Sequence, residues 1–90
     1  MIGRRFVIHG RVQGVGFRYF AIRAARRLGV VGIVRNLPNG GVEAIAEGTL
    51  AALEDFRREL ERGPDFALVS SVDETDVPLS GIYNGFDVAY

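Results

Sequence analysis

The stretch GRVQGVGFR, at residues 10–18, marks a sharp change of local pattern in the chain. An alternating apolar run at residues 4–12 leads into it, and helical periodicity begins near Phe17, so a tight loop must join a strand to a helix. Gly14 and Gly16 leave this loop almost without side chains and permit backbone angles that other residues avoid. Its amides can converge in front of the helix N-terminus, where the helix dipole and unpaired N–H groups favour an anion. The stretch therefore predicts an anion-binding loop.

Arg18 strengthens this prediction, because a cation in the first turn of a helix opposes the helix dipole. A guanidinium forms two parallel hydrogen bonds to a phosphate or a carboxylate, and it stays charged at any working pH. We therefore expect Arg18 to face a bound anion. The alternative is that the glycines only form a tight turn and that Arg18 pairs with a carboxylate on the protein surface.

Apolar periodicity divides the rest of the chain into strands and helices. Residues 4–12 place Gly10 on the apolar face, where another element can approach closely, and His9 on the solvent face, unsuited to act as a catalytic base. Thr49 is suited to cap the second helix, and Ser70-Ser71 breaks an alternating pattern as a β-bulge does. The patterns predict strands at residues 4–12, 30–37, 42–47, 67–77 and 86–90, and helices at residues 17–28 and 50–62.

Asn36 stands just before the turn sequence PNGG, at residues 38–41, in a strand where asparagine is disfavoured. Its side chain can tie down the turn, as asparagine often does. The residues alone favour this structural interpretation over a functional one.

Ninety residues predict one small domain, residues 1–90. The absence of cysteine excludes disulfides and thiolate metal sites, and a single histidine leaves too few ligands for a typical zinc site. No apolar run approaches the length of a membrane span, and the first residues lack the layout of a signal peptide. We therefore expect a cytoplasmic monomer with no bound metal and no membrane partner.

Charge is unevenly distributed, although the net charge is zero. The first 42 residues hold eight arginines and no acidic residue, hence +8, and the remainder holds eleven acidic residues and three arginines, hence −8. This balance argues against a globally basic nucleic-acid-binding protein. A local positive field around the loop can steer a small anionic substrate. The alternative, compatible with the first, is that the basic first helix pairs with the acidic second helix.

Three segments carry a family resemblance: GRVQGVGFR at residues 10–18, VRNLPNGGVE at 34–43 and GFDVAY at 85–90. In this order, over nearly the whole chain, they resemble the acylphosphatases. The resemblance implies an α+β, ferredoxin-like βαββαβ sandwich, with an antiparallel sheet and two helices on one face. It also implies hydrolysis of carboxyl phosphates. The chain departs from the family pattern at Ile33, where an aromatic residue is common.

The resemblance assigns the phosphate-binding arginine of the family to Arg18 and its water-orienting asparagine to Asn36. Such a site suits acyl phosphates, because the departing carboxylate has a pKa of about 4 and needs no protonation. Phosphoryl transfer mainly demands positioning and charge stabilisation, so neither a metal nor a cofactor is required. The predicted catalytic residues are Arg18 and Asn36, and the predicted phosphate-binding residues are Gln13, Gly14, Val15, Gly16, Phe17 and Arg18.

Two other functions are compatible with parts of the pattern. The first is a phosphate-binding module without turnover, or a domain like that in larger carbamoyl-transferring maturation proteins, which the length of 90 residues disfavours. The second is nucleic-acid recognition by the sheet, which would need exposed aromatic residues on the central strands. The predicted partner is therefore a small acyl phosphate, and the sequence offers no determinant for its acyl group.

Overall fold

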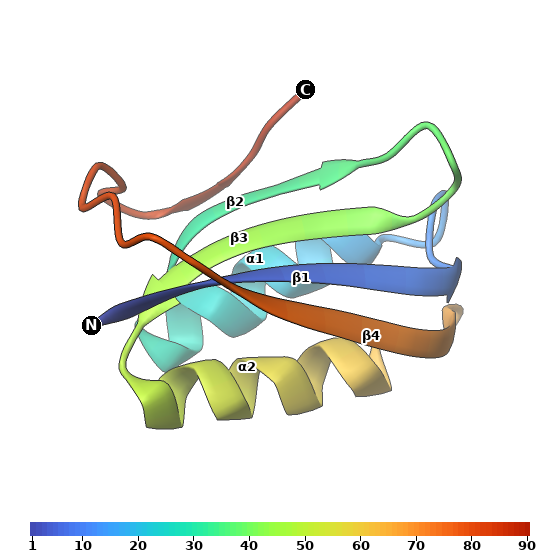
Figure 1. Ribbon diagram of the computed structural model, residues 1–90. Coiled ribbons are helices and arrows are strands. Elements are labelled where there is room, and N and C mark those ends of the chain that lie inside the picture. The colour runs from blue at the N-terminus through green and yellow to red at the C-terminus, as the bar shows by residue number, and fades with distance from the viewer.

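In the computed structural model, which describes residues 1–90, one five-stranded sheet is covered on one face by two antiparallel helices (Figure 1). Both helices have the predicted bounds, and the strands differ from prediction by no more than two residues at their ends. The elements are β1 (Ile2–Arg11), α1 (Phe17–Leu28), β2 (Val31–Asn36), β3 (Val42–Gly48), α2 (Leu50–Arg62), β4 (Leu68–Val77) and β5 (Phe86–Val88).

The strand order is β4-β1-β3-β2-β5, and the first four strands are antiparallel to their neighbours. The predicted ferredoxin-like fold is confirmed. The sheet is mixed rather than purely antiparallel, because β5 runs parallel to β2, with Gly32 opposite Phe86 and Val34 opposite Val88. The amide of Gly32 donates to the carbonyl of Gly85, and the amide of Ala89 donates to that of Val34, which fixes this short strand at the sheet edge.

Three phenylalanines join the two layers. The rings of Phe6 on β1 and Phe56 on α2 meet edge-to-face with centroids 5.8 Å apart, and Phe56 meets Phe86 on β5 at 5.5 Å. All three side chains are fully buried. Such aromatic pairs add about 0.5–1.5 kcal/mol each beyond the burial of apolar area. Phe86 therefore anchors the three-residue strand β5 in the main core.

The predicted bulge is confirmed in β4. His9 lies opposite Ser71 and Gly10 opposite Val69, so Ser70 is the extra residue. Gly10 has φ 126°, and a Cβ there would lie 2.1 Å from the carbonyl oxygen of Leu68. Gly10 is exposed rather than on the buried face, because the element that approaches it closely is the neighbouring strand and not a helix.

Ion pairs between arginines of the first half and acidic residues of the second half neutralise much of the uneven charge of the chain. Arg5 and Arg35 hold Glu43, which is 6% exposed, between β1 and β2, with Nε–Oε distances of 2.5 and 2.7 Å. Arg27 pairs with Glu59 across the helices at 2.8 Å, as predicted, whereas Arg26 pairs with Asp87 of β5.

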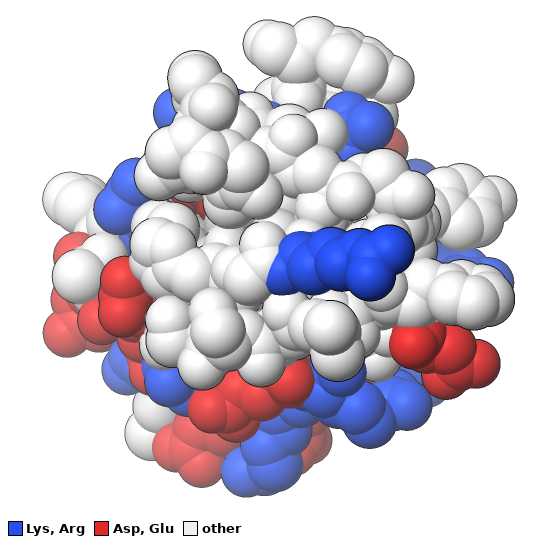
Figure 2. Space-filling model, turned by 90° about the vertical axis from the view of Figure 1, so that its right-hand side faces the viewer, with Lys and Arg blue, Asp and Glu red and all other residues white.

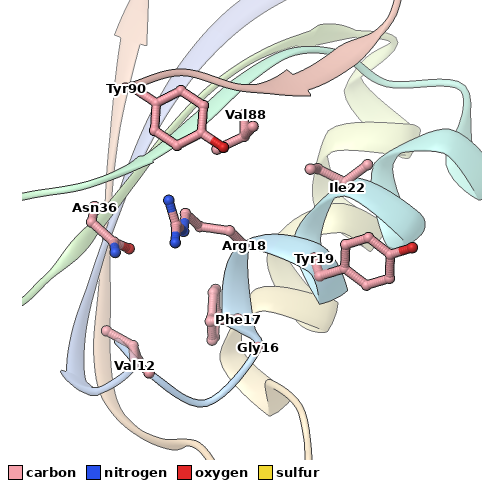
Figure 3. Close-up of a pocket in the computed structure, with 10 residues that line it drawn as sticks. Val12, Gly16, Phe17, Arg18, Tyr19, Ile22, Asn36, Val88 and Tyr90 are labelled. Atoms are coloured by element: carbon pink, nitrogen blue, oxygen red, sulfur yellow. The ribbon is translucent and has the colours of Figure 1, made fainter.

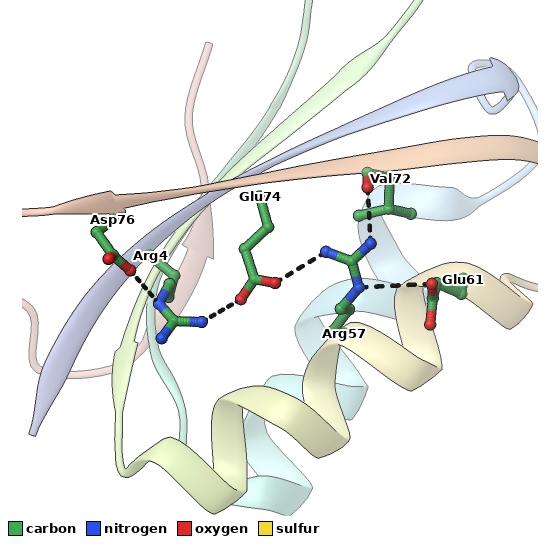
Figure 4. A network of polar contacts seen from close by, with 6 residues as sticks. All are labelled: Arg4, Arg57, Glu61, Val72, Glu74 and Asp76. Atoms are coloured by element: carbon green, nitrogen blue, oxygen red, sulfur yellow. Dashed lines mark hydrogen bonds and ion pairs between the residues drawn. The ribbon is translucent and has the colours of Figure 1, made fainter.

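A second network joins β1, β4 and α2 (Figure 4). Glu74 on β4 accepts from Arg4 and, at 2.9 Å, from Arg57 of α2. Arg57 also donates to the carbonyl of Val72 at 2.8 Å. Arg4 in turn lies 2.5 Å from Asp76. These contacts bind the edge strand β4 to the helix layer through charged side chains.

Glu47 on β3 is a buried carboxylate that holds the connection between β4 and β5. It is 2% exposed and accepts from the amide and hydroxyl of Ser80, both at 2.7 Å, and from the amide of Gly81 at 3.1 Å. The hydrogen bond from the Ser80 backbone holds the pKa of Glu47 below its usual range. Figure 1 shows the segment after β4 crossing the sheet toward β5. Glu47 therefore fixes the path by which β5 reaches the far edge.

We predict that Glu47→Gln lowers the free energy of unfolding by about 1–3 kcal/mol at pH 7, because one amide oxygen cannot replace three hydrogen bonds to a carboxylate. The lowered pKa means that ionised Glu47 stabilises the fold above the unfolded glutamate pKa of about 4.3, and that this stabilisation is lost as the pH falls through the folded pKa. Denaturant unfolding should therefore show the difference between parent and variant shrinking below about pH 4.

The matched control is Glu54→Gln, at an exposed position on α2. This variant should retain the stability of the parent both at pH 7 and below about pH 4. Equal stability of the two glutamine variants at pH 7 would contradict the role assigned to Glu47.

Candidate active site

The loop between β1 and α1 turns on two glycines in the left-handed region, Gly14 at φ 74° and Gly16 at φ 78°. A Cβ at either position would meet nothing within 4 Å, so the backbone angle rather than space demands glycine. Gly16 is also the residue that caps α1, and no side chain accepts a hydrogen bond at this end of the helix. The helix therefore begins with its amides uncovered.

Those amides have no partner within the protein. The first backbone hydrogen bond of α1 runs from the amide of Phe20 to the carbonyl of Gly16 at 3.0 Å, and no backbone or side-chain acceptor pairs with the amides of residues 14–19. Unpaired N–H groups at the positive end of a helix dipole form a site for an anion. The predicted anion-binding geometry of the loop is present.

A cavity of about 250 Å³ lies in front of this helix end (Figure 3). Arg18 projects its guanidinium into the cavity, and no carboxylate forms an ion pair with it. The alternative in which Arg18 pairs with a surface carboxylate is therefore wrong. Figure 2, which views this end of the molecule, shows a largely uncharged surface with one basic side chain lying across its centre, and the acidic side chains lie to the left, below and to the lower right.

Asn36, at the end of β2, directs its carboxamide toward the guanidinium of Arg18 (Figure 3). It is exposed, and its side chain forms no hydrogen bond within the protein. The turn is tied down by a different residue, because the Asn39 side-chain oxygen accepts from the amide of Gly41 at 2.9 Å. The structural interpretation of Asn36 is therefore wrong, and its carboxamide is available to a ligand.

Gln13 holds the loop against the β2–β3 hairpin. Its side-chain nitrogen donates to the carbonyl of Leu37 at 2.7 Å and to that of Gly41 at 2.9 Å. Leu37 directly follows Asn36, so this contact sets the position of the loop relative to that carboxamide. Neither Gln13 nor Val15 lines the cavity. The Gln13 side chain is engaged in its two hydrogen bonds to the hairpin, and Val15 packs against the core.

The cavity thus brings together five of the seven predicted site residues. Phe17 is one of them, but its ring is buried in the core, so only its backbone can serve a ligand. The predicted residues that line the cavity are Gly14, Gly16, Phe17, Arg18 and Asn36.

Five further lining residues lie outside the sequence prediction. Ile22 follows Arg18 by four residues and so shares its face of α1, a spacing that could have identified it. Tyr19 stacks on Arg23, whose guanidinium carbon lies 5.3 Å from the ring centroid. Val88 reaches the cavity only through the parallel pairing of β5 with β2, and no local sequence pattern predicts this pairing. The five are Val12, Tyr19, Ile22, Val88 and Tyr90.

Titratable groups are absent from the cavity apart from Arg18 and the two tyrosines. His9 lies elsewhere, partly exposed on the sheet, with its Nε2 2.8 Å from Asp73. No three His, Cys, Asp or Glu side chains are grouped so as to hold a metal ion. Neither helix is long and apolar enough to cross a membrane.

With its unpaired helix amides and unneutralised guanidinium beside a ferredoxin-like sheet, the chain falls in the class of small α+β proteins whose geometry suits the binding of an oxyanion. Comparison with known families narrows this class. The family model described as acylphosphatase matches residues 4–88. The chain belongs to the acylphosphatase family, and the family resemblance seen in the sequence is confirmed.

Relatives resemble this chain in sequence and structure over most or all of its length. An acylphosphatase of Archaeoglobus fulgidus is 42% identical over 90 residues, which cover all of both chains. One from Synechococcus sp. strain WH7803 is 52% identical over 77 residues, which cover 86% of this chain and 77% of the relative. The crystal structure of acylphosphatase from Bacillus subtilis superposes with a TM-score of 0.95 at 36% identity, over the full length of both chains.

The same fold also occurs within a larger protein. Full-length HypF in its phosphate- and nucleotide-bound form superposes with a TM-score of 0.87 at 28% identity, covering 99% of this chain but 12% of that one.

We predict that Gln13→Ala lowers the free energy of unfolding by about 1 kcal/mol, because two hydrogen bonds are lost while each carbonyl keeps a backbone donor. Gln13→Glu should be at least as destabilising, since a carboxylate has no proton to donate to the carbonyls of Leu37 and Gly41. Denaturant unfolding at pH 7 provides the measurement. A glutamate variant as stable as the parent would show that Gln13 only fills space.

Proposed function

We propose that this acylphosphatase hydrolyses the carboxyl–phosphate bond of acyl phosphates by direct in-line attack of water, with Arg18 and the loop amides binding the phosphate and Asn36 orienting the water. The observation that carries the proposal is the unpaired guanidinium of Arg18, which points into the cavity. The N-terminal end of α1, with its unpaired amides, lines the same cavity. The dianionic phosphate of an acyl phosphate would satisfy both at once.

The phosphate oxygens occupy the end of α1 in this proposal. The amides between Gly14 and Arg18 donate to them, and the Arg18 guanidinium adds two parallel, charge-assisted hydrogen bonds. Gln13 and Val15 contribute backbone only, since the side chain of Gln13 donates to the hairpin and that of Val15 packs inward. The positive charge that phosphoryl transfer requires thus comes from the protein itself, and the proposal includes no metal or cofactor.

The chemical step needs few participants. A water oxygen forms the new bond to phosphorus as the bond from phosphorus to the carboxylate oxygen breaks, and the electron pair of that bond leaves with the carboxylate. The departing group is the anion of an acid with a pKa of about 4, so it requires no proton. The water proton passes to phosphate or solvent. This accounts for a cavity without a carboxylate or histidine among its lining residues.

Asn36 supplies the remaining element, which is alignment. Its carboxamide has both a donor and an acceptor available, and it faces the guanidinium that holds the phosphate. A water that accepts from Asn36 can be held in line with the breaking bond. Holding the water in advance reduces the entropy that must be lost on reaching the transition state.

The proposal includes a small-molecule partner and a cytoplasmic monomer. Nucleic acid is not among the proposed partners, because the aromatic ring of β1, Phe6, is buried under the helices and its outward neighbours are Val7 and His9.

We predict that Arg18→Ala lowers kcat/KM for benzoyl phosphate by about 10³-fold or more, the scale on which arginines stabilise phosphoryl-transfer transition states. Arg18→Lys should recover only part of this loss, since an ammonium cannot form the two parallel hydrogen bonds. Initial rates and the circular dichroism spectrum of each variant provide the test. Arg58→Ala, an exposed arginine on α2, is the matched control; equal activity of the two alanine variants would refute the assignment.

We predict that Asn36→Ala lowers kcat by about 10²–10³-fold, the usual cost of removing one pre-aligned donor. Inhibition by inorganic phosphate should change much less, because Asn36 acts on the water rather than on the phosphate. Asn84→Ala, at an exposed position before β5, should leave both quantities unchanged. A loss of phosphate affinity as large as the loss of kcat would assign Asn36 to phosphate binding instead.

A further inference from the structure

Asn36 lies where the sheet supports the backbone of β2 on one side only. β2 pairs with β3 along its whole length, up to the pair formed by Asn36 and Val42. On its other side, the pairing with β5 ends where Val34 lies opposite Val88. The backbone of residues 35–36 therefore has a strand partner in β3 alone, at the point where the position of Asn36 is decided.

The side chain of Asn36 has no support of its own. It is exposed and forms no hydrogen bond within the protein, so its direction follows from the backbone that carries it. A group that aligns a reactant must be placed accurately, because a misplacement of about 1 Å can cost about 10²-fold in rate. The end of β2 must therefore be fixed by contacts of other residues.

Glu43 on β3 makes such a contact. It lies directly opposite Arg35 in the strand register, and its Oε1 accepts from the Arg35 Nε at 2.7 Å. Successive side chains of a strand point to opposite faces, so Arg35 lies on the face opposite the one from which Asn36 lines the cavity. The hydrogen bond thus holds β2 from the far face of the sheet, one residue away from Asn36.

The carboxylate of Glu43 has a second partner on a different strand. Its Oε2 accepts from the Nε of Arg5 on β1 at 2.5 Å, and Figure 1 shows β3 lying between β1 and β2. Burial raises the pKa of Glu43, but hydrogen bonds from Arg35 and Arg5 outweigh burial and hold it below its usual range. Both hydrogen bonds are therefore charge-assisted at neutral pH. Only the bond to Arg35 reaches the strand that carries Asn36.

Stability alone gives little reason for a buried carboxylate at this position. The neighbouring residues on the same face of the sheet are Val7, Ile33 and Ile45. Replacing a buried ion pair by well-packed apolar residues is often neutral or stabilising. What a charge-assisted hydrogen bond adds is a fixed direction between two side chains, and here those side chains belong to β3 and to the end of β2.

We propose that Glu43 and Arg35 are positioning residues for the hydrolysis: their hydrogen bond fixes the end of β2 so that Asn36 holds the attacking water in line. Neither residue lines the cavity, so both act through Asn36. This inference rests on the proposed function, since it takes the role of Asn36 from it.

The test measures kcat for benzoyl phosphate in Arg35→Met and Glu43→Met, which delete the hydrogen bond from either side. Each variant should lower kcat by about 10-fold, less than the loss expected for removing Asn36 itself. Inhibition by inorganic phosphate should stay close to that of the parent, because the loop and Arg18 are unchanged. Arg35→Lys should recover most of the lost kcat, since an ammonium can still donate to Glu43.

A double variant separates positioning from general damage to the fold. In the Asn36→Ala background, Arg35→Met should cause no further loss of kcat, because the group through which Arg35 acts is absent. Damage that does not act through Asn36 would lower kcat by the same factor in both backgrounds.

Arg5→Met is the matched control. It removes the other partner of Glu43, changes the net charge by the same amount and leaves the Arg35 hydrogen bond in place; the two arginine side chains are also similarly exposed, at 41% and 48%. This variant should retain the kcat of the parent, whatever it loses in denaturant unfolding.

Two sets of results would count against the inference. Parent kcat in Arg35→Met, an equal loss in Arg5→Met, or a loss that persists in the Asn36→Ala background would overturn the positioning role and leave the proposed function intact. Parent kcat in Asn36→Ala would instead overturn the role that the proposed function gives to Asn36, and this inference with it.

Discussion

A positive charge without a partner is the constraint on which this domain depends. Arg18 lies in the first turn of α1, where the helix dipole is already positive, and the neighbouring amides lack acceptors. Without a bound anion, the guanidinium and these amides do not stabilise one another. The surrounding structure must therefore hold them in place, and Phe17, buried immediately before Arg18, fixes the first helical turn through the core.

Two polar side chains bring distant segments to this helix end. Gln13 reaches from the loop to two carbonyls of the β2–β3 hairpin, and so sets the separation between the loop and Asn36. Glu47 holds the long connection that delivers β5, and with it Val88, to the other side of the cavity. In both cases one side chain binds several backbone groups. The cavity is thus assembled from three separated parts of the chain, residues 12–22, 36 and 88–90, and supported by regular elements, which favours precise geometry.

The sequence predicts local features well and distant ones poorly. Both helices were predicted to the residue, because apolar periodicity and terminal glycines act over a few positions, and Ser70-Ser71 identified the bulge. The position and direction of β5 leave no local pattern, since its pairing with β2 joins residues more than fifty positions apart. The convergence of Arg18 and Asn36 followed from family resemblance rather than from periodicity.

Side-chain direction marks the same limit within the site. Gln13 and Val15 were assigned to phosphate binding with the rest of the loop, but a loop sequence does not tell which side chains turn away from its amides. The burial of Glu43 and Glu47 also escaped prediction, because the arginines and amides that satisfy them lie on other strands and in a later loop.

The central place of β1 in the sheet has a consequence for the way the chain acquires its structure. β1 is the first strand to be translated, yet it lies between β3 and β4, and the second of these begins only at Leu68. The basic first half likewise meets its acidic counterparts only when the later strands have emerged from the ribosome. Since non-local pairing must close long loops before it stabilises the chain, the complete sheet can form only after β4 has been synthesised.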